Sequence, residues 1–434
     1  MSASRSYGRG AAVLSVGIGV TGLITYAYFA LASHSLPKDD YGRISLLWSA
    51  VFIVVSVLYR PVEQLLSRTI ADRAARGQTG NEHLRVAATI QLGLGALFAV
   101  VALVFRSKLE NDLFDGSAAL FWILFVAVLA YAASYFARGY LAGSRMFGLY
   151  GGLVFIESVA RCMFALAVAI GIAEGQKITA MGIAAAPLLS LVVVPWALGR
   201  RIRSTEGSEP REMGGEPDAS EPEFTLSHGA GFAVAVLLIM LCEQAIYNAG
   251  PLLIKATESP AAEASALAGF AFNVLLIARA PLQLFQAVQT SILPHLTTLR
   301  ATGETDPFRR SVQVTLMAIG LFSGAVALAM AALGPTIMRL AFGGNFDYSR
   351  GGLVMIALGM GFYLSAATLN QAALAHAQAK QAAVAWATTA IAFVVWLLLP
   401  GFDDRILQLE IGYLGAAGLL CSLLFVLYRR SLSA

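Results

Sequence analysis

Residues 118–141 read AALFWILFVAVLAYAASYFARGYL, an almost unbroken apolar run. As an α-helix, which rises about 1.5 Å per residue, a run of this length crosses the roughly 30 Å hydrocarbon core of a bilayer. Similar runs lie at 11–32 and 229–254. Alternating ten-residue strands typical of a β-barrel are missing, and in lipid only helices or closed barrels satisfy the backbone. The sequence therefore predicts an all-α polytopic membrane protein.

The composition supports the same fold class. Of the 434 residues, 58% are hydrophobic and 13% are charged, against about 25% charged in a typical soluble domain. If the N-terminus lies in the cytoplasm, the predicted cytoplasmic segments carry twice as many Lys and Arg as the outside segments. This asymmetry follows the positive-inside rule with both termini cytoplasmic. The net charge of +4 then reflects topology, and we expect no nucleic-acid partner.

About twelve spans follow from the apolar runs and their flanks. We place them at 10–33, 43–67, 84–105, 117–141, 150–173, 179–199, 229–254, 263–290, 309–333, 350–375, 380–400 and 406–428. A stretch rich in Glu, Pro, Gly and Ser, 200–228, should be a flexible cytoplasmic linker. It divides the chain into two six-helix bundles, 1–199 and 229–434, which we expect to be parallel repeats.

Motifs for several kinds of chemistry are missing. No stretch reads as a phosphate-binding P-loop, and the linker is too short for a nucleotide-binding domain. The three cysteines lie inside predicted spans, so no disulfide framework is implied. His376 has no second ligand at a suitable spacing, so we expect no metal site. We expect neither an enzyme nor a cofactor.

We single out six ionisable side chains inside the predicted spans, where each costs about 2.5–3.5 kcal/mol to insert and usually faces a cavity or a partner. Glu157 and Arg161 are four residues apart, so they can neutralise each other on one helix face as a structural pair. Arg60 and Glu63 are three apart, and Arg60 either faces a cavity or extends to the cytoplasmic surface. The remaining two are Glu243 and Arg279.

Glu243 and Arg279 should lie at similar depth near the middle of the membrane, because the seventh span runs outward and the eighth runs inward. Polar side chains accompany them at Asn248, Asn273, Gln283 and Gln286. A polar stripe of this length favours a water-filled cavity, with hydrogen bonding between helices as the alternative. We expect these four polar residues, with Arg60 and Arg279, to bind substrate, and Glu63 and Glu243 to couple transport to a proton or sodium gradient.

Several short segments, in order along the chain, resemble the polysaccharide-transporter branch of the multidrug/oligosaccharidyl-lipid/polysaccharide exporter superfamily. They are LPKDDYG at 36–42, RGYLAG at 138–143 with RMFG at 145–148, Glu157 with Arg161, Pro294, and LAFGG at 340–344 with Phe346.

The resemblance implies a V-shaped pair of six-helix bundles around a central cavity lined mainly by the first, second, seventh and eighth spans. It implies alternating access in the cytoplasmic membrane, and a flippase that moves an undecaprenyl-pyrophosphate-linked oligosaccharide from the inner to the outer leaflet for cell-surface polysaccharide assembly. Membrane lipids, a polysaccharide polymerase and glycosyltransferases are the partners that such a role implies. We expect a monomer, because one chain already supplies both halves of the cavity.

Two other functions fit parts of the sequence. A cation-coupled antiporter of drugs or organic cations would use carboxylates and aromatic faces, whereas a diphosphate calls for cations. A non-transporting subunit of a polymer-synthesis complex would need no charged cavity. Arg279 and the polar stripe favour the anionic substrate.

Overall fold

The computed structural model describes residues 2–75, 81–195, 226–279, 305–344, 346–376 and 378–433. Within these residues the regular structure is helical. Eleven of the described helices are long and apolar enough to cross a membrane. The 34-residue helix α1, Ser2–Ser35, covers the first predicted span. The predictions of an all-α membrane fold and of about twelve spans are therefore confirmed.

The first bundle is built from helices that are mostly longer than 15 residues. Its elements are α1, α2 (Lys38–Leu58), α3 (Arg60–Ala75), α4 (Glu82–Val104), α5 (Arg106–Lys108), the π-helical turn η1 (Leu109–Leu113), α6 (Ala118–Gly143), α7 (Phe147–Ala169), α8 (Gly175–Ser190) and the 3₁₀ turn η2 (Leu191–Val193). Within it, α1 packs against α7, while α6 packs against α3 and α8.

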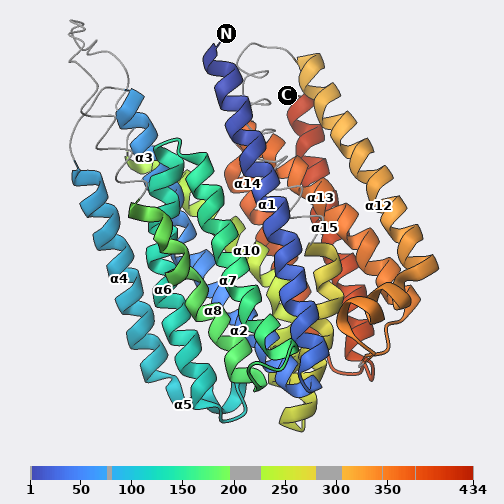
Figure 1. Cartoon of the computed structure of the whole chain (residues 1–434). Coiled ribbons are helices and arrows are strands. Elements are labelled where there is room, and N and C mark those ends of the chain that lie inside the picture. Colours follow the sequence, from blue (N-terminus) through green and yellow to red (C-terminus); the bar gives the residue numbers. More distant parts are fainter. Residues whose placement is uncertain are drawn as a thin grey trace, which may run out of the picture.

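The second bundle is similar in size. Its elements are α10 (Leu226–Thr257), the helix Ala261–Arg279, α12 (Thr305–Phe342), α13 (Arg350–Ala375), α14 (Ala379–Leu398) and α15 (Arg405–Ser433). Figure 1 shows the two bundles side by side, with both chain termini at the same end of the molecule. We call this the terminal end and the opposite one the distal end. Most of the predicted linker, 200–228, lies outside the described residues, and α10 begins at Leu226.

The second span is broken where the sequence predicted one helix. Helix α2 ends at Leu58 and α3 begins at Arg60. Pro61 has no backbone N–H, so the carbonyl four residues earlier receives no helical hydrogen bond, which is a common cause of a break. The break places Arg60 and Glu63 in the first turn of a new helix.

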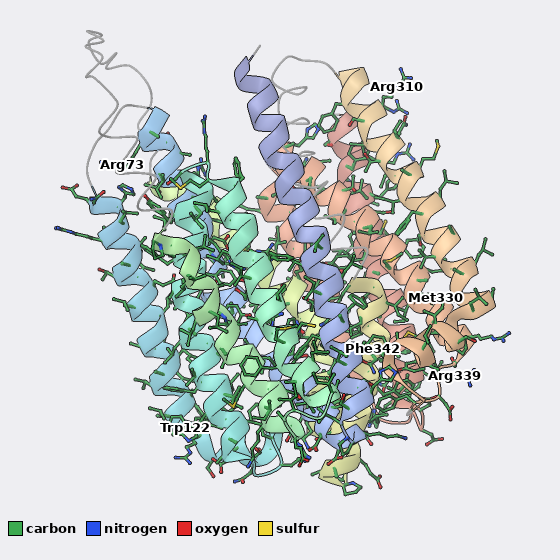
Figure 2. The ribbon with its side chains drawn as sticks, viewed as in Figure 1. Arg73, Trp122, Arg310, Met330, Arg339 and Phe342 are labelled. Atoms are coloured by element: carbon green, nitrogen blue, oxygen red, sulfur yellow. The ribbon has the colours of Figure 1, made fainter. Side chains whose placement is uncertain are left out.

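The two bundles are joined toward the distal end. Ser33 at the end of α1 donates a 2.5 Å hydrogen bond to the carbonyl of Phe342 at the end of α12. Figure 2 labels Phe342 and Arg339 in the distal half of α12, with Arg73 and Arg310 near the terminal end. Gly42 of α2 lies against Gly269, where a Cβ would come within 2.9 Å of the Gly42 Cα. Only glycines permit backbones to approach so closely.

An ion-pair cluster at Asp115 reinforces the distal contact. Asp115 follows η1 in the first bundle and accepts hydrogen bonds from Lys255 of α10 and, at 2.8 Å, from Ser265 in the helix Ala261–Arg279. Arg43 of α2 lies 3.3 Å from the same carboxylate. Lys255 is buried, so its charge needs this partner. The carboxylate therefore holds the bundles together at this end.

Candidate functional site

A central cavity of about 310 Å³ lies between the two bundles. Seven helices contribute to its wall: α1, α2, α3, α6 and α7 from the first bundle, then α10 and the helix Ala261–Arg279 from the second. The lining side chains are Thr21, Thr25, Trp48, Phe52, Ser56, Arg60, Glu63, Tyr135, Arg138, Tyr150, Val154, Glu157, Ser158, Arg161, Glu243, Gln244, Tyr247, Asn248 and Arg279. The cavity is thus broader than the predicted set of four spans, because α6 and α7 also supply charged residues.

The cavity wall is rich in charge of both signs. Four arginines and three glutamates line it, which leaves one positive charge in excess. Within the described part of the chain, no three His, Cys, Asp or Glu side chains are placed to hold a metal ion. The arginines are therefore the groups best suited to bind an anionic ligand.

Glu157 on α7 is the centre of a buried network. Its carboxylate lies 2.6 Å from Arg138 on α6 and 3.1 Å from Arg161 on its own helix. It also accepts hydrogen bonds from Tyr131 at 2.9 Å and Ser134 at 3.2 Å. Tyr131, Ser134 and Arg138 fall at helical spacing on one face of α6. A carboxylate with four donors is fully satisfied, so the network fixes α6 against α7.

Two of the arginines lie over aromatic rings in the same wall. The guanidinium of Arg161 is 4.5 Å from the ring centroid of Trp48 on α2. That of Arg138 is 4.6 Å from the ring of Tyr135. Such cation–π contacts stabilise a buried guanidinium against the wall.

Arg60 and Glu243 attract each other electrostatically across the cavity. The strongest electrostatic attraction on each comes from the other, although Arg60 is on α3 and Glu243 on α10. Glu63, one turn after Arg60, accepts a 3.0 Å hydrogen bond from Tyr150 of α7. The main electrostatic partner of Glu243 therefore lies in the other bundle, although Arg279 of its own bundle was predicted to lie at a similar depth.

Arg279 hydrogen-bonds to groups without charge. Its Nη2 donates to the backbone carbonyl of Tyr247 and, at 3.1 Å, to Oδ1 of Asn248. Pro251 lies inside α10, four residues after Tyr247, and has no N–H to offer that carbonyl. Arg279 replaces the missing helical donor. Among the described residues no carboxylate neutralises it, so its positive charge remains available to a ligand.

Most of the predicted site residues that the structure describes line the cavity. Arg60, Glu63, Glu157, Arg161, Glu243, Asn248 and Arg279 all line the cavity. Asn273 does not: it is fully buried, accepts from Tyr41 and donates to Tyr348 at 3.2 Å. It is not among the side chains that line the cavity, and it links α2 to the segment between α12 and α13. Gln283 and Gln286 lie outside the described residues.

Arg138 was not among the charged residues singled out from the sequence, although it falls inside the predicted span 117–141. The structure places it inside α6, five residues before the helix ends at Gly143, with a side chain 11% exposed. The missed signal was its position in the polar stripe of Tyr131 and Ser134, at the same helical spacing that places Arg161 one turn after Glu157.

Comparison by sequence gives distant relatives. No family model matches the chain. It is 26% identical over 385 residues to the uncharacterized protein Rv1510 of Mycobacterium tuberculosis, covering 86% of this chain and 82% of the relative. It is 25% identical over 401 residues to the uncharacterized protein Mb3654 of Mycobacterium bovis, covering 88% and 83%.

Comparison by structure identifies the fold. A multidrug resistance MATE family transporter of the MOP superfamily in its inward-facing conformation superposes with a TM-score of 0.65 at 13% identity, covering 97% of this chain and 98% of that one. The Vibrio cholerae MATE transporter VcmN gives a TM-score of 0.64 at 15% identity, covering 100% and 98%. The chain is thus a multi-pass membrane protein with the fold of MATE transporters, two helical bundles around a central cavity.

Proposed function

We propose that this protein is a flippase that moves a lipid-linked oligosaccharide, carried on undecaprenyl diphosphate, from the inner to the outer leaflet of the cytoplasmic membrane. The observation that carries the proposal is the excess positive charge of the cavity, concentrated at Arg279. A diphosphate cannot enter hydrocarbon alone, and its oxygens suit the paired N–H groups of a guanidinium.

Alternating access follows from where the bundles meet. In our proposal the terminal end faces the cytoplasm, so Asp115, Lys255 and the Gly42–Gly269 contact close the outer side. The cavity then receives the headgroup from the inner leaflet. Outward opening requires these distal contacts to separate while each bundle moves as a unit.

Arg60 and Arg279 form the two halves of the phosphate site in this proposal. Arg60 is supplied by α3 of the first bundle, and Arg279 by the second. Phosphate binding to Arg60 would compete with Glu243, the charge that attracts it from the opposite bundle. Binding of cargo would therefore weaken an attraction between the bundles, which is how a ligand shifts such an equilibrium.

An organic-cation antiporter is the second candidate. The same cavity holds three carboxylates and the aromatic rings of Trp48, Phe52 and Tyr247, and a multidrug transporter is among the similar structures. Against this, Glu157 is neutralised by two arginines at 2.6 and 3.1 Å. A cationic ligand would depend on Glu63 and Glu243.

Binding to the purified protein separates the two candidates. We expect undecaprenyl diphosphate to bind, and Arg279→Gln to weaken this binding by about tenfold or more, since a charged hydrogen bond contributes about 1.5–3 kcal/mol. Glu243→Gln should leave it intact or strengthen it. If a lipophilic cation binds instead, and Glu243→Gln abolishes that binding while Arg279→Gln does not, the antiporter is the correct assignment.

We also propose that Glu243 couples transport to a proton or sodium gradient. Its carboxylate faces the cavity beside Arg60, so it can exchange this partner for a cation when phosphate occupies the arginine. Glu243→Gln should then make transport independent of the imposed gradient, measured in proteoliposomes with and without a pH or sodium difference. An unchanged gradient dependence would exclude Glu243 as the coupling group.

The proposed function also implies two enzymes that act before and after transport. A glycosyltransferase must supply the lipid-linked glycan on the cytoplasmic side, and a polymerase acting on such glycans outside would consume it. Both halves of the site come from one chain, so we propose a monomer as the working unit.

A further inference from the structure

Two further hollows lie between the central cavity and the terminal end. The first, about 360 Å³, is lined by Glu63, Gln64, Ser67, Arg68, Ala71, Ala142, Phe147 and Tyr150. It shares Glu63 and Tyr150 with the cavity. The second, about 520 Å³, shares Ala71 with the first and adds side chains of the turn between α6 and α7, including Ser144 and Arg145. We call the first hollow the α3–α7 groove.

The volumes show why the cavity alone cannot hold the whole proposed headgroup. At about 310 Å³ it lies at the lower end of the roughly 300–1,000 Å³ range for sites that hold drug-sized ligands. A diphosphate bearing several sugars is larger than such a ligand. The α3–α7 groove adds about 360 Å³ beside the cavity, toward the terminal end.

The lining of the groove differs from that of the cavity. Gln64 lies one turn before Ser67 and Arg68 on the same face of α3. These side chains offer amide, hydroxyl and guanidinium groups. Phe147 and Tyr150 of α7 supply aromatic rings on the other side. Planar donors opposite aromatic rings suit a sugar, which has hydroxyls around its edge and C–H groups on its faces.

The hydrogen bond between Glu63 and Tyr150 lies where the cavity meets the α3–α7 groove. Tyr150 donates to Glu63 Oε1 at 3.0 Å and thereby ties α3 to α7 where the cavity and the groove meet. A headgroup with its phosphates at Arg60 would pass this junction with its first sugar. Tyr150 can present both its ring and its hydroxyl there.

We propose that the α3–α7 groove is a glycan subsite, which binds the sugars of the cargo beyond the diphosphate and so selects among lipid-linked glycans. This rests on the proposed function, because it assumes a lipid-linked cargo. It assigns the selection to the groove, whereas Arg60 and Arg279 bind the phosphates that such cargoes share.

Protection of single cysteines from a membrane-impermeant maleimide tests the subsite. The three native cysteines are first replaced by serine or alanine. Thr21→Cys then reports on the cavity, Ser67→Cys on the groove, and Thr69→Cys serves as control, since Thr69 is on α3 outside both linings. The two probes are undecaprenyl diphosphate without sugar and the lipid-linked oligosaccharides extracted from the cells that make this protein.

We expect the bare lipid diphosphate to protect Thr21→Cys alone, and the glycan-bearing lipid to protect both Thr21→Cys and Ser67→Cys. At about ten times the dissociation constant, occupancy should slow labelling roughly tenfold. Neither probe should protect Thr69→Cys. Gln64→Ala together with Arg68→Ala should reduce the protection by the glycan-bearing lipid and leave that by the bare lipid unchanged.

Three results would overturn the subsite. Equal protection of Ser67→Cys by the bare lipid diphosphate would show that the groove holds lipid or phosphate. Protection of Thr21→Cys by both probes without protection of Ser67→Cys would confine the headgroup to the cavity and leave the proposed function standing. If neither probe protects either position, both the subsite and the flippase proposal fail.

Discussion

At Arg279, one guanidinium satisfies a backbone carbonyl and also faces the cavity. The carbonyl of Tyr247 lacks a helical donor because of Pro251, and Arg279 supplies the hydrogen bond. A buried carbonyl without a partner costs about 1–3 kcal/mol. Loss of transport in an Arg279 variant could thus reflect lost folding stability as well as lost phosphate binding.

A second substitution separates the two contributions. We expect Arg279→Ala to lower the unfolding temperature and to nearly abolish transport. Adding Pro251→Ala restores an N–H to α10, so the double variant should recover most of the unfolding temperature and none of the transport. Recovery of transport together with stability would show that Arg279 has only a structural role.

Glu157 stabilises the fold, because its carboxylate neutralises two buried arginines. Glu157→Gln leaves Arg138 and Arg161 buried without a counter-charge, so it should destabilise the protein by about 3–5 kcal/mol. The control is Glu110→Gln, which breaks a more exposed pair with Arg106 at 3.3 Å and should cost less than about 1 kcal/mol. Thermal unfolding in detergent compares them, and equal shifts would contradict the role of the network.

Helix α2 and the helix Ala261–Arg279 approach each other closely across the two bundles. A Cβ at Gly42 would clash with the carbonyl of Ser265, so the contact exists only because that position has no side chain. Gly42→Ala should therefore push the distal ends apart. We expect faster labelling of Thr21→Cys by an impermeant maleimide added from the distal side.

A glycine in an open position provides the control. A Cβ at Gly93 on α4 meets no atom within 4 Å, so Gly93→Ala should leave the labelling rate unchanged. If Gly42→Ala also leaves it unchanged, the glycine contact does not close the distal end.

The sequence predicted the helices well and their partners less well. Long apolar runs define spans because the bilayer imposes a length, and Pro61 contained the information needed to place the break before α3. The pairing of Arg60 with Glu243 depends on how two bundles sit against each other, which no local spacing encodes. The same limit placed Asn273 in the cavity, although it joins helices beside it.

In the proposed transport cycle, the two bundles alternate between two arrangements. The described arrangement is held at the distal end by Asp115, which contacts Lys255 and Ser265, and its further hollows lie toward the terminal end. The reverse arrangement needs those contacts broken, and cargo bound to both Arg60 and Arg279 would be carried between the bundles as they move.

In the proposed function, this cavity carries a lipid-linked diphosphate across the membrane. The most direct measurement is the rate at which a lipid-linked oligosaccharide, loaded in one leaflet of liposomes, becomes accessible to a glycan-cleaving enzyme on the other side. We predict that the wild-type protein raises this rate above that of protein-free liposomes and that Arg279→Ala with Pro251→Ala, although folded, returns it to the protein-free value. A wild-type rate equal to the protein-free rate, or an undiminished rate in that double variant, would contradict the account.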